Sequence, residues 1–95
     1  MPSSFDQAVL HKIVPDLTLR LRRIAGQAQG IERMLLEGRD CDQIVNQVAA
    51  LKAAVEQVGV SVVGCLMESA IREAMEQGAD TRDAIDRAKQ LLRRI

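Results

Sequence analysis

The stretch "IVNQVAALKAAVEQVGVSVVGC", residues 44–65, decides the fold of this chain. It contains no proline, and its glycines, Gly59 and Gly64, weaken a helix without ending it. Its apolar side chains alternate steps of four and three residues, which is the pattern of a heptad seam. These seam residues are Ile44, Val48, Leu51, Val55, Val58, Val62 and Cys65. The stretch therefore predicts a helix that packs against another helix along its length.

The helix centred on residues 44–65 is expected to extend in both directions. Asp40 suits the N-cap position, and no strong breaker follows before Gly78, which predicts a helix over about 41–77. Such a helix would be about 55 Å long at 1.5 Å per residue, whereas a compact chain of this size is only about 26 Å across. Much of the apolar seam would therefore stay in water in a single protomer, which predicts self-association.

A shorter helix is expected before the long one. Apolar residues recur at spacings of three and four across residues 15–37, and Gly38 supplies a C-terminal stop. Pro15 is favoured at the first position of a helix and disfavoured inside one. We therefore expect residues 1–14 to form a mobile arm and residues 15–95 to form a single helical domain.

A third, short helix is expected over residues 81–94, with Asp80 or Thr81 as its cap. The predicted fold class is thus all-α, a three-helix protomer with one very long central helix. Antiparallel pairing of that helix with its copy gives a four-helix-bundle dimer, and a further apolar stripe could join two dimers into a tetramer. The stripe consists of Val45, Ala49, Val63, Leu66 and Ala70.

The composition limits the class of protein. Hydrophobic residues make up 47% of the chain and charged residues 27%, which indicates a folded globular protein. One Phe and no Trp or Tyr exclude a platform of aromatic side chains for stacking bases. Because 13 basic and 13 acidic residues cancel, only a local patch could bind a polyanion.

The sequence also bears on location and on catalysis. No uninterrupted apolar run approaches the roughly 18 residues of a membrane span, and the N-terminus lacks the features of a secretory signal. We expect a cytoplasmic protein with no membrane partner, in which both cysteines stay reduced. The chain has no recognisable pair of catalytic carboxylates, no phosphate-binding loop and no nucleophile beside a base, so we do not expect an enzyme.

A cluster of arginines is the local basic patch. Arg20 and Arg23 are three residues apart and share a face of the predicted helix, with Arg22 around the cylinder and Gln27 one turn further on. Such a face fits DNA phosphates, and self-association would repeat it along a surface. The alternative is an ordinary solvated helix face.

Three segments carry a resemblance to a known family. They are "RLRRIAGQAQGIERML" at residues 20–35, "EGRDC" at 37–41 and "IVNQVAALKAAV" at 44–55. From about Leu17 to its C-terminus the chain resembles the CsoR/RcnR/FrmR family of small cytoplasmic transcriptional repressors. The resemblance implies an all-helical dimer that assembles into a disc-like tetramer. It also implies binding to double-stranded operator DNA without a helix-turn-helix, and release when an inducer reacts with or ligates a cysteine.

The resemblance assigns roles to individual residues. Cys41 corresponds to the sensor cysteine of the family. The DNA-contacting basic positions of the family map onto Arg20 and Arg23, with Lys52 as an expected third.

The resemblance also bears on metals. In the copper-sensing branch a histidine and a second cysteine complete the site, and the residues at those positions here are Leu66 and Ala70. Neither side chain binds a metal, so that copper site and a nickel or cobalt site on the same histidine are expected to be absent. A non-standard metal site built from Cys41, Cys65 and the lone imidazole of His11 is a weaker alternative.

The preferred inducer is therefore a thiol-reactive small molecule, and two chemistries stay open. An aldehyde such as formaldehyde could bridge Cys41 to the amine of Pro2, which becomes the N-terminus if Met1 is removed. Sulfane sulfur (a persulfide) could instead link Cys41 to Cys65 of a second copy, although Cys65 also fits a buried core thiol. A helical protein-interaction module without DNA binding is the alternative from another class.

Overall fold

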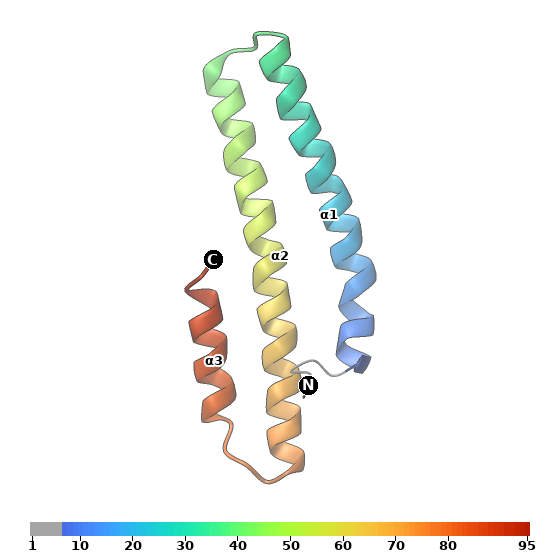
Figure 1. The fold of residues 1–95 in the computed structure, drawn as a ribbon, viewed down its shortest axis with the longest axis vertical. Coiled ribbons are helices and arrows are strands. Elements are labelled where there is room, and N and C mark those ends of the chain that lie inside the picture. The colour runs from blue at the N-terminus through green and yellow to red at the C-terminus, as the bar shows by residue number, and fades with distance from the viewer. Residues whose placement is uncertain (1–6) are drawn as a thin grey trace.

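The computed structural model describes residues 7–95 and contains three α-helices in that part of the chain, α1 (Gln7–Leu36), α2 (Cys41–Glu76) and α3 (Arg82–Leu92). No strand occurs among these residues, so the all-α prediction is confirmed. α1 and α3 both run antiparallel to α2 and flank it on different sides (Figure 1). Within the described chain α1 and α3 each contact α2 but not one another, so α2 joins the fold together.

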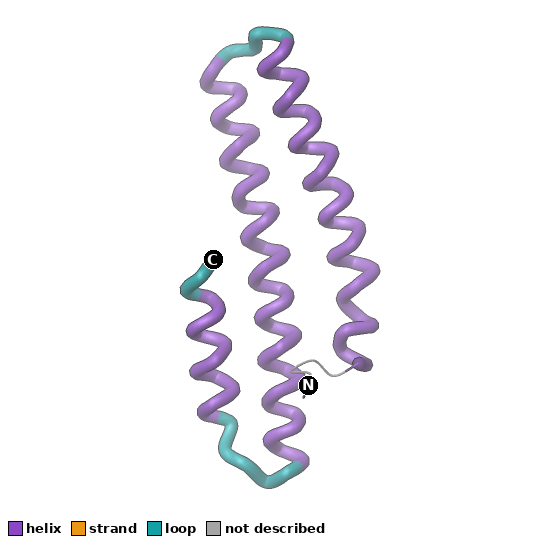
Figure 2. The backbone as a smooth tube through the Cα atoms, in the orientation of Figure 1, coloured by secondary structure: helices purple, strands orange, loops and turns teal. Residues whose placement is uncertain are grey.

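The long central helix has nearly the bounds expected from the sequence, since α2 contains 36 residues and ends at Glu76. The turns at its two ends lie at opposite ends of the protomer (Figure 2). Gly38 and Gly78 have φ angles of 68° and 67°, in the left-handed region that favours glycine. After α1, Gly38 N donates to Leu35 O (3.2 Å) and Arg39 N donates to Met34 O (2.9 Å), which forms a Schellman motif.

The start of α1 differs from the expectation. The helix begins at Gln7 rather than at Pro15, so the part of the expected arm between residues 7 and 14 is helical. Pro15 lacks the backbone N–H that would bond to the carbonyl of His11, but this removes only one bond of the helix. Ile13 is half-buried and Leu17 is buried, so packing on both sides of Pro15 stabilises a continuous helix. Residues 1–6 of the expected arm, including Pro2, lie outside the described residues.

The third helix is shorter than expected. Thr81 occupies the N-cap position without a side-chain hydrogen bond. The neighbouring Asp80 accepts instead, with Oδ1 2.9 Å from Arg82 N and Oδ2 2.9 Å from Arg82 Nε. Beyond Leu92 the chain continues to Ile95, whose side chain lies so close to α2 that a Cβ at Gly59 would come within 2.8 Å of its Cδ1. The C-terminal end of α3 thus rests on the middle of α2.

The core lies in the C-terminal half of α2, where both other helices flank it. The buried residues of the described chain are Leu17, Val63, Cys65, Leu66, Ser69 and Ala88. The heptad seam stays open in part, because Val48 is 47% exposed and Val55 is 49% exposed, although Ile44, Leu51 and Val58 are half-buried and Cys65 is buried. This is the exposure expected of a protomer that pairs with a second copy. The stripe proposed to join two dimers differs, since Val63 and Leu66 are already buried within the protomer.

The exposed seam gives α2 a second property. By length and composition alone α2 is apolar enough to cross a membrane, although no uninterrupted apolar run of that length is present, and only 11% of its most apolar window is buried. A seam that is buried by a second copy of the chain produces the same pattern in a soluble helix. The apolar character of α2 is therefore weak evidence for a membrane.

Candidate functional site

Two of the predicted DNA-binding arginines line a small cavity between α1 and α2. Arg20 and Arg23 contribute from α1, together with Ile24 and Gln27, while Ala54 and Gln57 contribute from α2. We call this cavity, whose volume is 170 Å³, the arginine notch. Two arginines and two glutamines line the notch beside the apolar Ile24 and Ala54, and their side chains carry N–H donors of the kind that bind an oxyanion.

A carboxylate restrains one of these arginines. Arg20 Nε lies 3.1 Å from Asp16 Oδ2, one helical turn earlier on α1. The two side chains are 44% and 60% exposed, so water screens the ion pair and its net contribution to stability is only about 0.2–1 kcal/mol. An arriving phosphate can therefore replace Asp16 as the partner of Arg20 at little cost.

The other predicted basic residues do not line the arginine notch. Arg22 is exposed on α1. Lys52 is exposed on α2 and, at 3.6 residues per turn, points about 200° away from Ala54 and about 140° away from Gln57. In the protomer Lys52 therefore lies on the opposite flank of α2 from Arg20 and Arg23.

Gln57 was not among the residues predicted from the sequence, because a neutral carboxamide on another helix does not belong to a cluster of basic residues. Gln57 enters the notch because α1 and α2 pack antiparallel, with Arg20 and Arg23 level with it. The sequence does hold one indication of this position. Gln57 is three residues from Ala54, so the two side chains share one face of α2, the face that packs against α1.

The candidate sensor cysteine lies far from the notch. Cys41 is the first residue of α2 and is exposed. Asp40 occupies the N-cap position before it, as expected, but its side chain makes no capping hydrogen bond. Nearby, Arg39 Nε donates to Gln43 Oε1 (3.2 Å). Cys41 is thus an accessible thiol directly after the turn that links α1 and α2.

The second cysteine has a different environment. Cys65 is 4% exposed and follows Ala54 by eleven residues, so it lies within about 20° of the α1-facing side of α2. Along the same helix it is about 36 Å from Cys41. The protomer therefore does not bring the two thiols together, and α1 covers the side of α2 that carries Cys65.

The positions of the family's additional copper ligands line another cavity. Leu66 and Ala70 line a 370 Å³ space between α2 and α3, opposite Ala84 and Arg87. Their hydrocarbon side chains offer no atom that binds Cu(I). His11 is exposed on α1, and the described residues contain no group of three or more His, Cys, Asp or Glu side chains placed to hold a metal. The donor set of the protomer does not fit the copper site of that branch.

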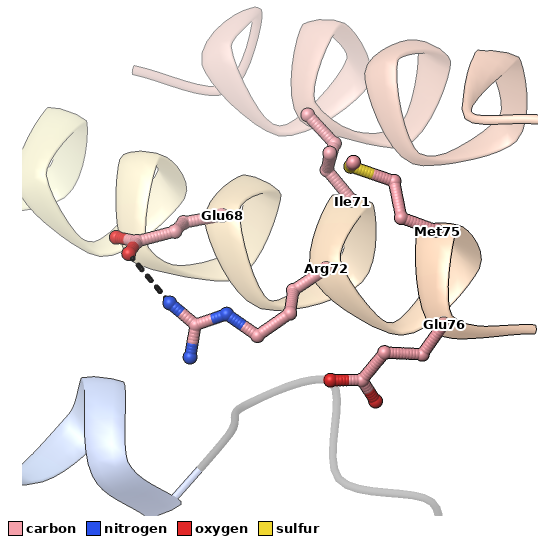
Figure 3. A pocket seen from close by; sticks show the side chains of 5 residues that line it. All are labelled: Glu68, Ile71, Arg72, Met75 and Glu76. Atoms are coloured by element: carbon pink, nitrogen blue, oxygen red, sulfur yellow. Dashed lines mark hydrogen bonds and ion pairs between the residues drawn. The ribbon is translucent and has the colours of Figure 1, made fainter.

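A shallow hollow on the C-terminal half of α2 contains none of the predicted site residues. Five side chains line its volume of 590 Å³, namely Glu68, Ile71, Arg72, Met75 and Glu76. Arg72 Nη2 lies 3.1 Å from Glu68 Oε1, the contact dashed in Figure 3. Because Met75 is 71% exposed, the hollow is an open apolar surface rather than an enclosed site.

Comparisons with known proteins place this geometry in context. The family model described as metal-sensitive transcriptional repressor matches residues 14–94. The uncharacterized protein YrkD of Bacillus subtilis (strain 168) is 34% identical over 59 residues, which cover 62% of this chain and 94% of YrkD.

Two copper-sensing repressors are also similar. The copper-sensing transcriptional repressor RicR of Mycobacterium tuberculosis (strain ATCC 25618 / H37Rv) is 30% identical over 64 residues, which cover 67% of each chain. The copper-sensing transcriptional repressor CsoR of Bacillus subtilis (strain 168) is 32% identical over 62 residues, which cover 65% of this chain and 61% of CsoR. No solved structure matches this chain.

Proposed function

This chain belongs to the CsoR/RcnR/FrmR family of metal-sensitive transcriptional repressors, and from that premise we propose that it is a cytoplasmic, operator-binding repressor that an inducer releases by acting at Cys41. The family consists of transcriptional repressors rather than enzymes, which confirms the prediction that this chain is not an enzyme. The single observation that supports the DNA-binding half is the arginine notch. The single observation that supports the sensing half is the exposure of Cys41 at the start of α2.

The notch suits the DNA backbone better than it suits base edges. Arg20, Arg23, Gln27 and Gln57 offer donors around one small cavity, and phosphate oxygens accept from such donors without regard to sequence. Pairing of the exposed α2 seam with a second copy would repeat the notch within a dimer or tetramer. Several notches acting on one duplex would give the steep salt dependence of phosphate binding.

The proposed inducer is thiol-reactive. In the aldehyde route, formaldehyde carbon bonds to Cys41 Sγ and to the amine nitrogen of Pro2, and one water molecule leaves. In the sulfur route, a persulfide transfers its outer sulfur to Cys41, and attack by Cys65 of a second copy then releases sulfide and leaves a disulfide. The burial of Cys65 means that the second route requires α2 to separate locally from α1.

Modification at Cys41 can reach the notch through the helices. The modified thiol would lie directly after the α1–α2 turn, and a link from Cys41 to another segment would displace that end of the hairpin. α1 and α2 both continue from the turn to the notch, about 20 Å away at 1.5 Å per residue. A shift of α1 along α2 would misalign Arg20 and Arg23 with phosphates that they bind in the repressing state.

A metal inducer is the second candidate, because the matched family is described as metal-sensitive and RicR and CsoR are described as copper-sensing. Within this chain such a site would rely on Cys41, with Cys65 or His11 from another position as further donors. The ligand set would differ from that of the copper branch, since Leu66 and Ala70 provide no donor atoms.

The test begins with a duplex that the wild-type protein selects from a random pool. Binding is then measured after exposure to formaldehyde, a persulfide donor, Cu(I), Ni(II) or Co(II), with Cys41→Ser and Cys65→Ser compared side by side. We expect release by a thiol-reactive compound that Cys41→Ser abolishes, together with a covalent adduct in the denatured intact mass. If the inducer still released the Cys41→Ser variant fully from the duplex, the assignment of Cys41 as the sensor would be contradicted.

The same experiment separates the alternatives. Release by a metal alone, with the metal retained in native mass and no covalent adduct, would select the metal-responsive reading. A chain that selects no duplex at all would favour the protein-interaction module. In that case binding to its partner through apolar contacts should depend little on salt, unlike binding to DNA.

A further inference from the structure

The C-terminal end of α3 is strongly basic. Residues 87–95 contain four basic side chains and no acidic one, namely Arg87, Lys89, Arg93 and Arg94. Lys89, Arg93 and Arg94 are exposed. Basic residues in the last turn of a helix interact favourably with its dipole, which accounts for part of this cluster. The dipole of α3 does not account, however, for a basic residue on the neighbouring helix α2.

The fold holds this end of α3 in a defined position. Arg93 N donates to Lys89 O (3.2 Å) and Ile95 N donates to Leu92 O (3.1 Å), so the backbone remains ordered past the helix. The Ile95 side chain rests over Gly59, where a Cβ would be only 2.8 Å from Ile95 Cδ1. Figure 1 shows this end of the chain beside the middle of α2.

The middle of α2 adds a further positive charge. Lys52 precedes Gly59 by seven residues, which places it about 10 Å further along α2 and within about 20° of the same face. The acidic residue on the stretch between them is Glu56, which is half-buried, whereas Lys52 is exposed. Lys52 therefore lies about 10 Å along α2 from the point where Ile95 rests, on the flank of α2 that is opposite the arginine notch.

We propose that Lys52, Lys89, Arg93 and Arg94 form a second DNA-backbone surface, the α3-tip patch, which binds duplex phosphates independently of the arginine notch. The inference rests on the proposed function, since it assumes that the protein binds DNA. The partner is a duplex phosphodiester backbone because the four side chains supply positive charge, and none of them is an aromatic ring on which a base could stack. Each protomer then neutralises phosphates on two flanks of α2.

The test compares two double variants that remove the same charge. Arg93→Gln/Arg94→Gln removes two positive charges from the patch. The control, Arg72→Gln/Arg82→Gln, removes two from the opposite end of the α2–α3 unit. Binding to the selected duplex and to a scrambled duplex is followed by fluorescence anisotropy across a salt series, and circular dichroism and sedimentation check that each variant folds and assembles as the wild type does.

We expect the patch variant to bind both duplexes about tenfold more weakly near 0.1 M salt, with a slope of log K against log salt that is shallower by about one or more. The control should change affinity by less than about twofold. Loss on both duplexes is expected because phosphate contacts do not read sequence. Should the double variant fold poorly, Lys52→Gln on α2 against Arg82→Gln on α3 gives the same comparison with single charges.

The outcomes distinguish this inference from the proposed function. If the wild type binds DNA, Arg20→Ala weakens binding and the patch variant behaves like its control, the α3-tip patch is overturned and the repressor assignment stands. If the wild type binds neither duplex, both fail. If the patch variant loses the selected duplex but keeps the scrambled one, the patch reads sequence and the assignment to the backbone is wrong.

Discussion

The two halves of α2 carry the same apolar repeat but have different environments. In the C-terminal half, α1 and α3 flank the helix, and Val63, Cys65 and Leu66 are buried. In the N-terminal half α1 is the one described helix alongside, and Val48 and Val55 remain exposed. The boundary lies near Gly59, where the C-terminal end of α3 meets α2. A heptad pattern thus predicts which apolar side chains are stabilised by burial. The length of the neighbouring helix decides which of them are buried within the protomer.

The largest expected effect concerns the exposed half. Val48→Asp/Val55→Asp should convert the proposed oligomer to monomer, because burying an unpaired carboxylate in the seam costs several kcal/mol. The dissociation constant should rise more than about 100-fold. Sedimentation equilibrium measures it, with Ala53→Asp, about 200° around α2 from Val55, as a matched control. Unchanged assembly of the seam variant would show that the exposed half pairs with nothing.

The next effect concerns the buried half. Leu66→Ala should lower the free energy of unfolding by about 2–4 kcal/mol, since it leaves a space between α2 and α3 that the helices fill incompletely. Val45→Ala, in the exposed half, should cost less than about 1 kcal/mol. Denaturant unfolding followed by circular dichroism measures both changes. Equal costs would mean that assembly buries the two halves alike.

A smaller effect concerns the arginine notch near the boundary between the halves. Arg20→Ala and Arg23→Ala should each weaken binding to the selected duplex about 10–100-fold and make its salt dependence shallower, because each removes a phosphate contact. Arg82→Ala, at the far end of α3, serves as the control in the same anisotropy titration. If either variant binds the duplex as tightly as the control does, that arginine does not contact the DNA.

The smallest effect concerns the partner of Arg20. Asp16→Asn should tighten binding to the duplex about twofold to fivefold, because it removes a carboxylate that competes with phosphate for the guanidinium. Asp83→Asn, in the first turn of α3 and away from the α3-tip patch, changes the net charge equally and should have less effect. Weaker binding by Asp16→Asn would instead indicate that Asp16 orients Arg20 for DNA.

Much of the fold could be predicted because local signals were strong. Gly38 and Gly78 end α1 and α2 in left-handed conformations that favour glycine, so the bounds of α2 were nearly right. The start of α1 was less predictable. Pro15 disfavours a helix locally, but packing of Ile13 and Leu17 favours one, and the sequence does not give the balance between them.

The candidate site could be predicted only where its residues share one helix. Arg20 and Arg23 were selected together from their spacing, and both line the notch. Gln57 was missed, and the sequence did not show that Lys52 lies on the other flank of α2 from Arg20 and Arg23, because both positions depend on how α2 is rotated relative to α1. That rotation depends on packing between side chains distant in sequence.

The sequence by itself determined the helical class, the length of α2, the apolar seam and the position of a thiol at the first turn of α2, because each depends on interactions within a few residues. The tertiary structure decided that α1 reaches back to Gln7, that Cys65 is buried while Leu66 lines the space against α3, and that Ile95 rests over Gly59. Neighbouring positions on a helix point about 100° apart. A side chain therefore acquires its environment only when another helix packs against its particular face.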